Sequence, residues 1–121
     1  MNVLVILNDP PYGTERSYNG LRLAGSLAKR EGHDVRVFLM RDASSCAKAG
    51  QAVPQGWHNL NRMLTVVIQN RGAVGVCGSC MDARGLKGRA GSGHAAQFAR
   101  GAHRLDAVSG PGPGVLRERD L

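Results

Sequence analysis

The sequence is poor in aromatic residues and contains no apolar run long enough to cross a membrane. Aromatic side chains make up 4% of the 121 residues, so the chain has few of the rings on which single-stranded nucleic acid stacks. Its start lacks the basic, then apolar, then small-residue pattern of a secretory leader. Three cysteines are an odd number and too few for a disulfide scaffold. These absences lead us to expect a protein of the reducing cytoplasm with no membrane partner.

The chain also lacks any dense run of basic residues, although its formal net charge is +7. Lys and Arg outnumber Asp and Glu by ten to six in residues 1–86 and by six to three in the remainder. A basic surface attracts polyanions over long distances, but here the charge is spread along the chain. We therefore expect no nucleic-acid partner, and a basic nucleic-acid-binding module stays open only as an alternative function.

Length and hydrophobic patterning predict one α/β domain with a mainly parallel sheet. A continuous apolar run at 2–7 is typical of a strand buried on both faces. Alternating apolar residues at 34–40 predict a second strand. Helical periodicity predicts helices over 14–30 and from 57 or 58 to 70, and a short apolar run predicts a third strand at 73–77. A strand, a helix and a strand in succession form a unit whose crossover is right-handed.

The most informative segment is residues 74–85, Val-Gly-Val-Cys-Gly-Ser-Cys-Met-Asp-Ala-Arg-Gly. Its apolar start delivers Cys77 to the end of a strand, and Cys80 follows in a stretch that suits a helix. A helix N-terminus lowers the pKa of a cysteine, because its unpaired N–H groups and its dipole favour the thiolate. A Cys-x-x-Cys pair beside such a boundary is the pattern expected of redox or sulfur-handling sites. We therefore predict that Cys77 and Cys80 are the catalytic residues.

Four further side chains are predicted to line a cleft with this pair. In an open α/β sheet, ligands bind at the carboxyl ends of the strands, where Asn8, Arg41 and Cys77 stand. The loop at 41–56 leaves that edge and is long enough to suggest a function. The predicted cleft-lining residues are Asn8, Tyr12, Cys46 and Arg84.

Two side chains near the predicted cleft allow more than one interpretation. Arg84 either contacts the thiolate or only caps the helix or pairs with Asp82. His58, at the start of a helix, is interpreted as a structural residue rather than a proton shuttle. A zinc site is not expected, because one Cys-x-x-Cys pair and a distant histidine lack the second close pair of ligands. We predict no metal and no cofactor.

Three segments carry a family pattern in matching order and spacing. They are residues 7–19 (Leu-Asn-Asp-Pro-Pro-Tyr-Gly-Thr-Glu-Arg-Ser-Tyr-Asn), residues 46–51 (Cys-Ala-Lys-Ala-Gly-Gln) with Pro54 and Gly56, and residues 77–85 (Cys-Gly-Ser-Cys-Met-Asp-Ala-Arg-Gly). Together they resemble the DsrE/DsrF-like family of sulfur-relay proteins, in its small stand-alone members. The resemblance covers residues 1 to about 87.

The resemblance implies a flavodoxin-like, three-layer α/β fold that usually assembles as homotrimers or homohexamers. It also implies that a cysteine at the end of a central strand carries sulfur as a persulfide. Cys77 matches that position, and Cys80 is an extra thiol of this subgroup. The implied partners are a sulfur donor and a sulfur acceptor, and no cofactor is implied.

The thiol chemistry leaves two functions open. A persulfide carrier must hold a thiolate at neutral pH, accept a sulfur atom from a donor and yield it to a nucleophile. Sulfur relay through Cys77 is the leading function. Cys80 then either attacks the persulfide, which releases sulfide and leaves a disulfide, or is simply buried. The alternative is a dithiol redox protein that uses Cys77 and Cys80 together.

Beyond Lys87 the chain changes character. Residues 88–121 are dominated by Gly, Ala, Arg and Pro, with only a helical possibility at 94–104. The family pattern normally continues with an acidic stretch, a helix that contains a Trp-Thr pair and a last strand, and all three are absent here. We predict an incomplete DsrE-like domain at 1–87, with its C-terminal helix and strand missing or altered, and a disordered tail at 88–121.

A one-base shift of the reading frame accounts for this change. From the second base of codon 88, the codons compatible with residues 88–107 permit the string DELVQGTRRSSREELTDWTL, which is close to the missing family segment. We predict that the residues from 88 onward are read in a shifted frame and are not a selected tail.

Overall fold

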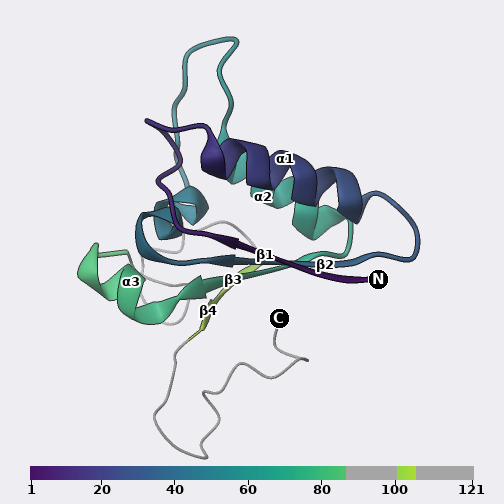
Figure 1. The fold of residues 1–121 in the computed structure, drawn as a ribbon. Coiled ribbons are helices and arrows are strands. Elements are labelled where there is room, and N and C mark those ends of the chain that lie inside the picture. The colour runs from purple at the N-terminus through teal and green to yellow at the C-terminus, as the bar shows by residue number, and fades with distance from the viewer. Residues whose placement is uncertain (87–100, 106–121) are drawn as a thin grey trace, which may run out of the picture.

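The computed structural model describes residues 1–86 and 101–105, which build a four-stranded parallel sheet with helices (Figure 1). The strands stand in the order β1-β2-β3-β4, and each pairs in parallel with the next. Their bounds are Asn2–Leu7 (β1), Asp34–Leu39 (β2), Ala73–Cys77 (β3) and Ala102–Leu105 (β4). The helices are Arg16–Ala28 (α1), Leu60–Gln69 (α2) and Gly78–Ala83 (α3), with a 3₁₀ helix at Arg41–Ala47 (η1). The predicted flavodoxin-like α/β fold with a mainly parallel sheet is confirmed.

Helices α1 and α2 lie on the same face of the sheet because of the strand order (Figure 1). When parallel strands follow one another in chain order, right-handed crossovers all return over one face. The residues that α1 and α2 bury recur every three or four positions. They are Ser17, Leu21, Ala24, Gly25 and Ala28 in α1 and Leu60, Leu64 and Val67 in α2. The fully buried strand residues are Val35, Val37, Leu39, Val74 and Val76. The core therefore lies between the sheet and these two helices.

The other face of β1 is left open by the described helices. Leu4 is 49% and Ile6 is 51% exposed, whereas the alternate residues Val3, Val5 and Leu7 belong to the core or pack against it. The prediction that this strand is buried on both faces is wrong. With α1 and α2 on one side, alternate side chains of β1 point to the side that these helices do not cover.

Two helix starts differ from the prediction. α1 begins at Arg16, with Glu15 as its N-cap residue, rather than at residue 14. α2 begins at Leu60 because the Asn59 side chain accepts the backbone N–H of Arg62 at 3.1 Å. A side-chain acceptor of this kind satisfies one of the free N–H groups at a helix start, so the residues before Asn59 remain in the loop.

β4 lies in the segment where no strand was expected. Ala102–Leu105 pairs with β3, and Ala102 is buried. The prediction that no strand follows Lys87 is therefore wrong at these residues. A segment of this length offers too little alternation to be read as a strand, and its pairing depends on the backbone of β3. The remainder of the predicted tail lies outside the described residues.

Candidate functional site

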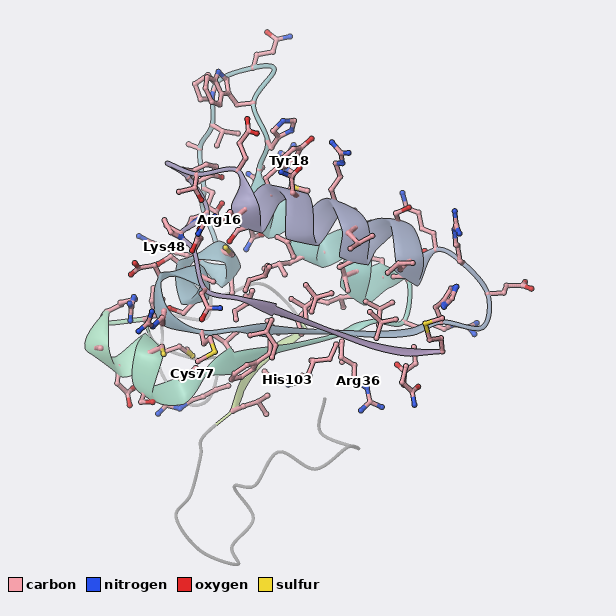
Figure 2. All side chains as sticks on the ribbon, viewed as in Figure 1. Arg16, Tyr18, Arg36, Lys48, Cys77 and His103 are labelled. Atoms are coloured by element: carbon pink, nitrogen blue, oxygen red, sulfur yellow. The ribbon has the colours of Figure 1, made fainter. Side chains whose placement is uncertain are left out.

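Cys77 stands at the junction between β3 and α3, as the sequence predicts. It is the last residue of β3 and the N-cap residue of α3. Gly78 and Ser79 follow it and open the helix, and small residues allow the chain to turn sharply here. Figure 2 places Cys77 at the carboxyl end of the sheet, where its side chain is half-buried.

Hydrogen-bond donors in the next three residues favour the thiolate of Cys77. Partial burial alone would raise the pKa of Cys77, but hydrogen bonds from the Cys80 thiol, the Ser79 hydroxyl and the backbone N–H groups of both residues lower it below its ordinary value. Ser79 Oγ lies 3.4 Å from Cys77 Sγ. Because each donor stabilises a negatively charged sulfur, Cys77 is the thiol of the pair that ionises first.

Cys80 is the thiol of the pair with the raised pKa. Its pKa is raised, first because its hydrogen bond to Cys77 favours the thiol form, then by partial burial and by the charge of Cys77. The backbone N–H of Arg41, which lies 3.1 Å from Cys80 Sγ, and the charge of Arg84 act in the opposite direction. Of the two thiols, Cys77 therefore ionises first and Cys80 keeps its proton to higher pH.

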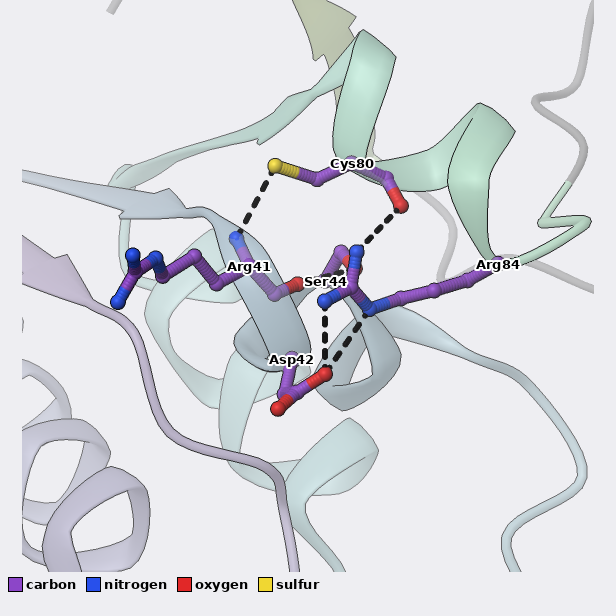
Figure 3. A network of polar contacts seen from close by, with 5 residues as sticks. All are labelled: Arg41, Asp42, Ser44, Cys80 and Arg84. Carbon is purple, nitrogen blue, oxygen red and sulfur yellow. Dashed lines mark hydrogen bonds and ion pairs between the residues drawn. The ribbon is translucent and has the colours of Figure 1, made fainter.

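Arg41 reaches Cys80 through an uncommon backbone conformation. Its φ is 51°, in the left-handed region that residues with a side chain seldom adopt. The residue opens η1 directly beyond the carboxyl end of β2. Figure 3 shows its backbone N–H directed at the sulfur of Cys80. The carboxyl ends of β2 and β3 thus meet at the cysteine pair.

Arg84 joins α3 to η1 (Figure 3). Its Nε and Nη2 donate to Asp42 Oδ1 at 3.1 and 2.7 Å, and its Nη1 donates to the Cys80 carbonyl oxygen at 3.0 Å. The sequence-based pairing of Arg84 with Asp82 is wrong, because Asp82 pairs with Arg104 at 2.7 Å. The role of Asp42 was missed, since no local pattern links it to Arg84. Arg84 acts on the Cys80 thiol through its charge and holds the Cys80 carbonyl oxygen.

Cys46 does not line this site. It is fully buried in η1, and burial raises its pKa to about 12, although hydrogen bonds with Ser17 and with the backbone act in the opposite direction. The prediction that Cys46 lines the cleft is therefore wrong. η1 packs against α2 and turns this side chain into the core.

Asn8 and Tyr12 occupy the carboxyl edge without joining the cysteines. Asn8 is exposed directly after β1. The Tyr12 hydroxyl donates to Gln51 Oε1 at 2.6 Å, and its ring lines a hollow beside the start of α1 that also contains Trp57. No cysteine is among the described residues that line this hollow. The predicted cleft is therefore not one site, because Tyr12 lines a hollow that is separate from the cysteine pair.

The described residues contain no group of three or more His, Cys, Asp or Glu side chains that could hold a metal ion. His58 stacks on Tyr18, with ring centroids 3.8 Å apart and an interplanar angle of 17°. This contact gives His58 a packing role at the base of the loop that precedes α2.

Comparisons with known proteins agree with the predicted family. The model of the DsrE/DsrF-like family matches residues 1–102. Protein YchN of Escherichia coli (strain K12) is 36% identical over 85 residues, which cover 69% of this chain and 72% of that protein. An uncharacterized protein of Methanocaldococcus jannaschii is 40% identical over 87 residues, which cover 72% of this chain and 75% of that protein.

The fold also has a counterpart among solved structures. The crystal structure of the ychN protein from E. coli superimposes with a TM-score of 0.74 at 30% sequence identity, covering 87% of this chain and 84% of that one. Within the part of the chain that the structure describes, no helix is both long and apolar enough to span a membrane.

Proposed function

Because this chain belongs to the DsrE/DsrF-like family, we propose that it relays sulfur as a persulfide on Cys77. The observation that carries the proposal is the set of donors around Cys77 Sγ, which lowers the pKa of a half-buried thiol at the end of a central strand. A sulfur carrier needs this combination of a thiolate and access from solvent.

Loading is a thiol exchange on a sulfur donor. The Cys77 thiolate attacks the outer sulfur of a donor persulfide, a new S–S bond forms on Cys77, and the donor cysteine leaves as its thiolate. The outer sulfur atom passes from the donor cysteine to Cys77, and no net oxidation occurs. The donors from Ser79 and Cys80 that hold the thiolate prepare Cys77 for this attack.

Unloading runs the same exchange toward an acceptor. An acceptor thiolate attacks the outer sulfur of the Cys77 persulfide, the S–S bond to Cys77 breaks, and Cys77 leaves as a thiolate. A thiol with a lowered pKa is a good leaving group, so the environment that favours attack on the donor also favours release to the acceptor. The partners we propose are accordingly a sulfur donor and a sulfur acceptor protein in the cytoplasm.

We propose a homotrimer or homohexamer as the working assembly. The proposal is supported by the family, whose members usually form such oligomers. Sedimentation of the purified chain tests it, and a monomer at micromolar concentration would contradict it.

A dithiol redox function is the second candidate, and the hydrogen bond between Cys80 and Cys77 favours it. Here the Cys80 thiolate attacks Cys77 Sγ, the inner sulfur of the persulfide. The bond between Sγ and the outer sulfur breaks, a disulfide forms between the two residues, and the outer sulfur leaves as sulfide. Two electrons from an external dithiol then restore both thiols. Sulfide would be released in step with disulfide formation, and Cys80→Ser would abolish that release.

The test of the relay is a sulfur adduct on one residue. After incubation with a cysteine desulfurase and cysteine, mass spectrometry should find one added sulfur on the peptide that contains Cys77. Cys77→Ser should lose the adduct, whereas Cys80→Ser, the matched control in the same segment, should keep it. Equal adduct formation in the Cys77→Ser protein would remove the carrier role.

A further inference from the structure

The loop at 48–59 is fixed at its base by Gln51. The Nε2 of Gln51 donates to the Lys48 carbonyl oxygen at 2.9 Å, and its Oε1 accepts the hydroxyl of Tyr12 at 2.6 Å. The Nδ2 of Asn59 donates to the Gln51 carbonyl oxygen at 2.9 Å. Two of these bonds lie within the loop, and the bond from Tyr12 ties the loop to the segment that precedes α1. A space held in this way is preorganised for a ligand.

That space is a hollow of about 660 Å³ whose lining includes four aromatic side chains and one carboxylate, Glu15. Tyr18 and His58 are stacked on one another along it. Tyr12 is 39% exposed and Trp57 is 71% exposed at its rim. The volume lies within the range of roughly 300–1,000 Å³ that small-molecule sites occupy. Flat aromatic walls favour a flat ring as the occupant.

A second hollow of about 590 Å³ adjoins the first and shares Tyr18, Trp57 and His58 with it. It is lined by two arginines, Arg22 and Arg62, and none of the described residues that line it is acidic. The guanidinium carbon of Arg22 lies 5.8 Å from the centre of the Tyr18 ring. Two guanidinium groups without a carboxylate beside them favour an anion, and phosphate matches their planar donors.

We propose that the two hollows form one binding site for a nucleotide, with the base against Trp57 and Tyr12 and the phosphate between Arg22 and Arg62. A flat heteroaromatic ring that carries a phosphate meets both requirements at once. A free nucleotide and one unit of a single strand offer the same chemistry. The site uses neither cysteine and goes beyond the sulfur relay.

The chain contains a single tryptophan, so its intrinsic fluorescence reports on this site alone. Adenosine 5′-monophosphate, titrated at constant ionic strength, should quench Trp57 fluorescence in a saturable way. Adenosine should bind more weakly, because it lacks the phosphate, and inorganic phosphate should leave the emission unchanged, because it lacks the ring.

Two matched arginine substitutions distinguish a specific contact with the phosphate from a general effect of positive charge. Arg62→Gln should weaken binding of adenosine 5′-monophosphate about tenfold, the effect of one charge-assisted contact, and should leave adenosine binding unchanged. Arg30→Gln removes the same charge from an exposed residue beyond the end of α1 that lines neither hollow. It should leave both affinities unchanged.

Three results would overturn the site. They are the absence of saturable quenching at millimolar adenosine 5′-monophosphate, equal affinity for the nucleotide and adenosine in the unsubstituted chain, and equal losses in the Arg62→Gln and Arg30→Gln proteins. A short oligoadenylate distinguishes the two sources of the ligand. If the oligoadenylate binds more tightly than the monophosphate, the ligand is a single strand. If the two bind equally, the ligand is a free nucleotide.

Discussion

The backbone N–H of Arg41 donates to the sulfur of Cys80 at 3.1 Å (Figure 3). The two residues lie 39 positions apart in the chain and leave the carboxyl ends of neighbouring strands. This contact, together with the ion pair between Arg84 and Asp42, ties the cysteine-bearing helix to η1. The environment of Cys80 therefore depends on a second segment of the chain, η1, as well as on its own helix.

Cys77 should be the most reactive of the three cysteines. With limiting iodoacetamide, peptide mapping should find Cys77 alkylated before Cys80 and Cys46, because its thiolate is favoured at the lowest pH. Ser79→Ala removes a donor to the thiolate and should shift the pH profile of Cys77 alkylation upward. Ser26→Ala, on the exposed side of α1, is the control and should leave the profile unchanged. Faster labelling of Cys80 would reverse the assignment.

Arg84→Gln should affect the pKa of Cys80 more than the stability of the fold. Its ion pair with Asp42 is partly exposed, at 30% and 62% for the two side chains, and such pairs contribute about 1 kcal/mol or less. Loss of the positive charge should raise the pKa of Cys80 further. Urea unfolding should show the small loss of stability, and alkylation of Cys80 should move to higher pH. A large fall in stability with no change at Cys80 would show a purely structural role.

Cys46 should make the fold less stable at alkaline pH. Burial raises its pKa from 9.0 to about 12, so above pH 9 the unfolded chain releases this proton while the folded chain keeps it. The free energy of unfolding should then fall with rising pH between about 9 and 12, by at most about 1.4 kcal/mol per unit. Urea titrations at several pH values should show a shallower slope for Cys46→Ala. Equal slopes would mean that Cys46 ionises without unfolding.

Two glycine substitutions should have opposite signs. A Cβ at Gly72 would lie 2.8 Å from the Val67 carbonyl oxygen and 3.1 Å from that of Val35, so Gly72→Ala should destabilise the fold by about 1–3 kcal/mol. A Cβ at Gly25, inside α1, would meet Val66 Cγ1 at an ordinary 3.6 Å. Gly25→Ala should stabilise the fold by about 0.5–1 kcal/mol, because alanine loses less backbone entropy in a helix. Thermal unfolding of both variants measures the difference.

The reading frame at codon 88 carries the prediction with the largest effect on stability. We propose that the chain from residue 88 onward is read in a shifted frame, which the open face at Leu4 and Ile6 supports. An uncovered apolar face promotes association and removes several kcal/mol from a total of about 5–15. Deleting one base at codon 88 should raise the thermal midpoint, sharpen the unfolding transition and reduce binding of a hydrophobic dye.

Sequencing the gene around codon 88 gives a direct check. Cooperative melting of the unaltered chain, with a tail that resists protease, would contradict the shifted frame. β4 lies within the affected segment. A strand pairs through backbone groups, which every residue except proline supplies in full, so β4 can pair with β3 in either reading frame. A packed helix depends on the identity of its side chains.

Much of the fold could be read from local patterns. The strands at Asn2–Leu7 and Ala73–Cys77 coincide with their predicted ranges, because a short apolar run between turn residues is a strong signal on its own. The position of Cys77 at a strand end follows from the same pattern. The end of a helix depends on single contacts, such as the cap of Asn59 on α2, and no period in the sequence shows those contacts.

The sequence by itself determined the parallel α/β architecture, the strand-to-helix position of Cys77 and its spacing from Cys80, because periodicity and turn residues act over a few positions. Tertiary structure alone decided that Cys46 is buried, that Arg84 pairs with Asp42 and that Tyr12 faces a separate hollow. Each of these depends on which segments meet after the chain has crossed over the sheet. Burial and long-range pairing are set by contacts between segments that are distant in the sequence, and no local pattern encodes them.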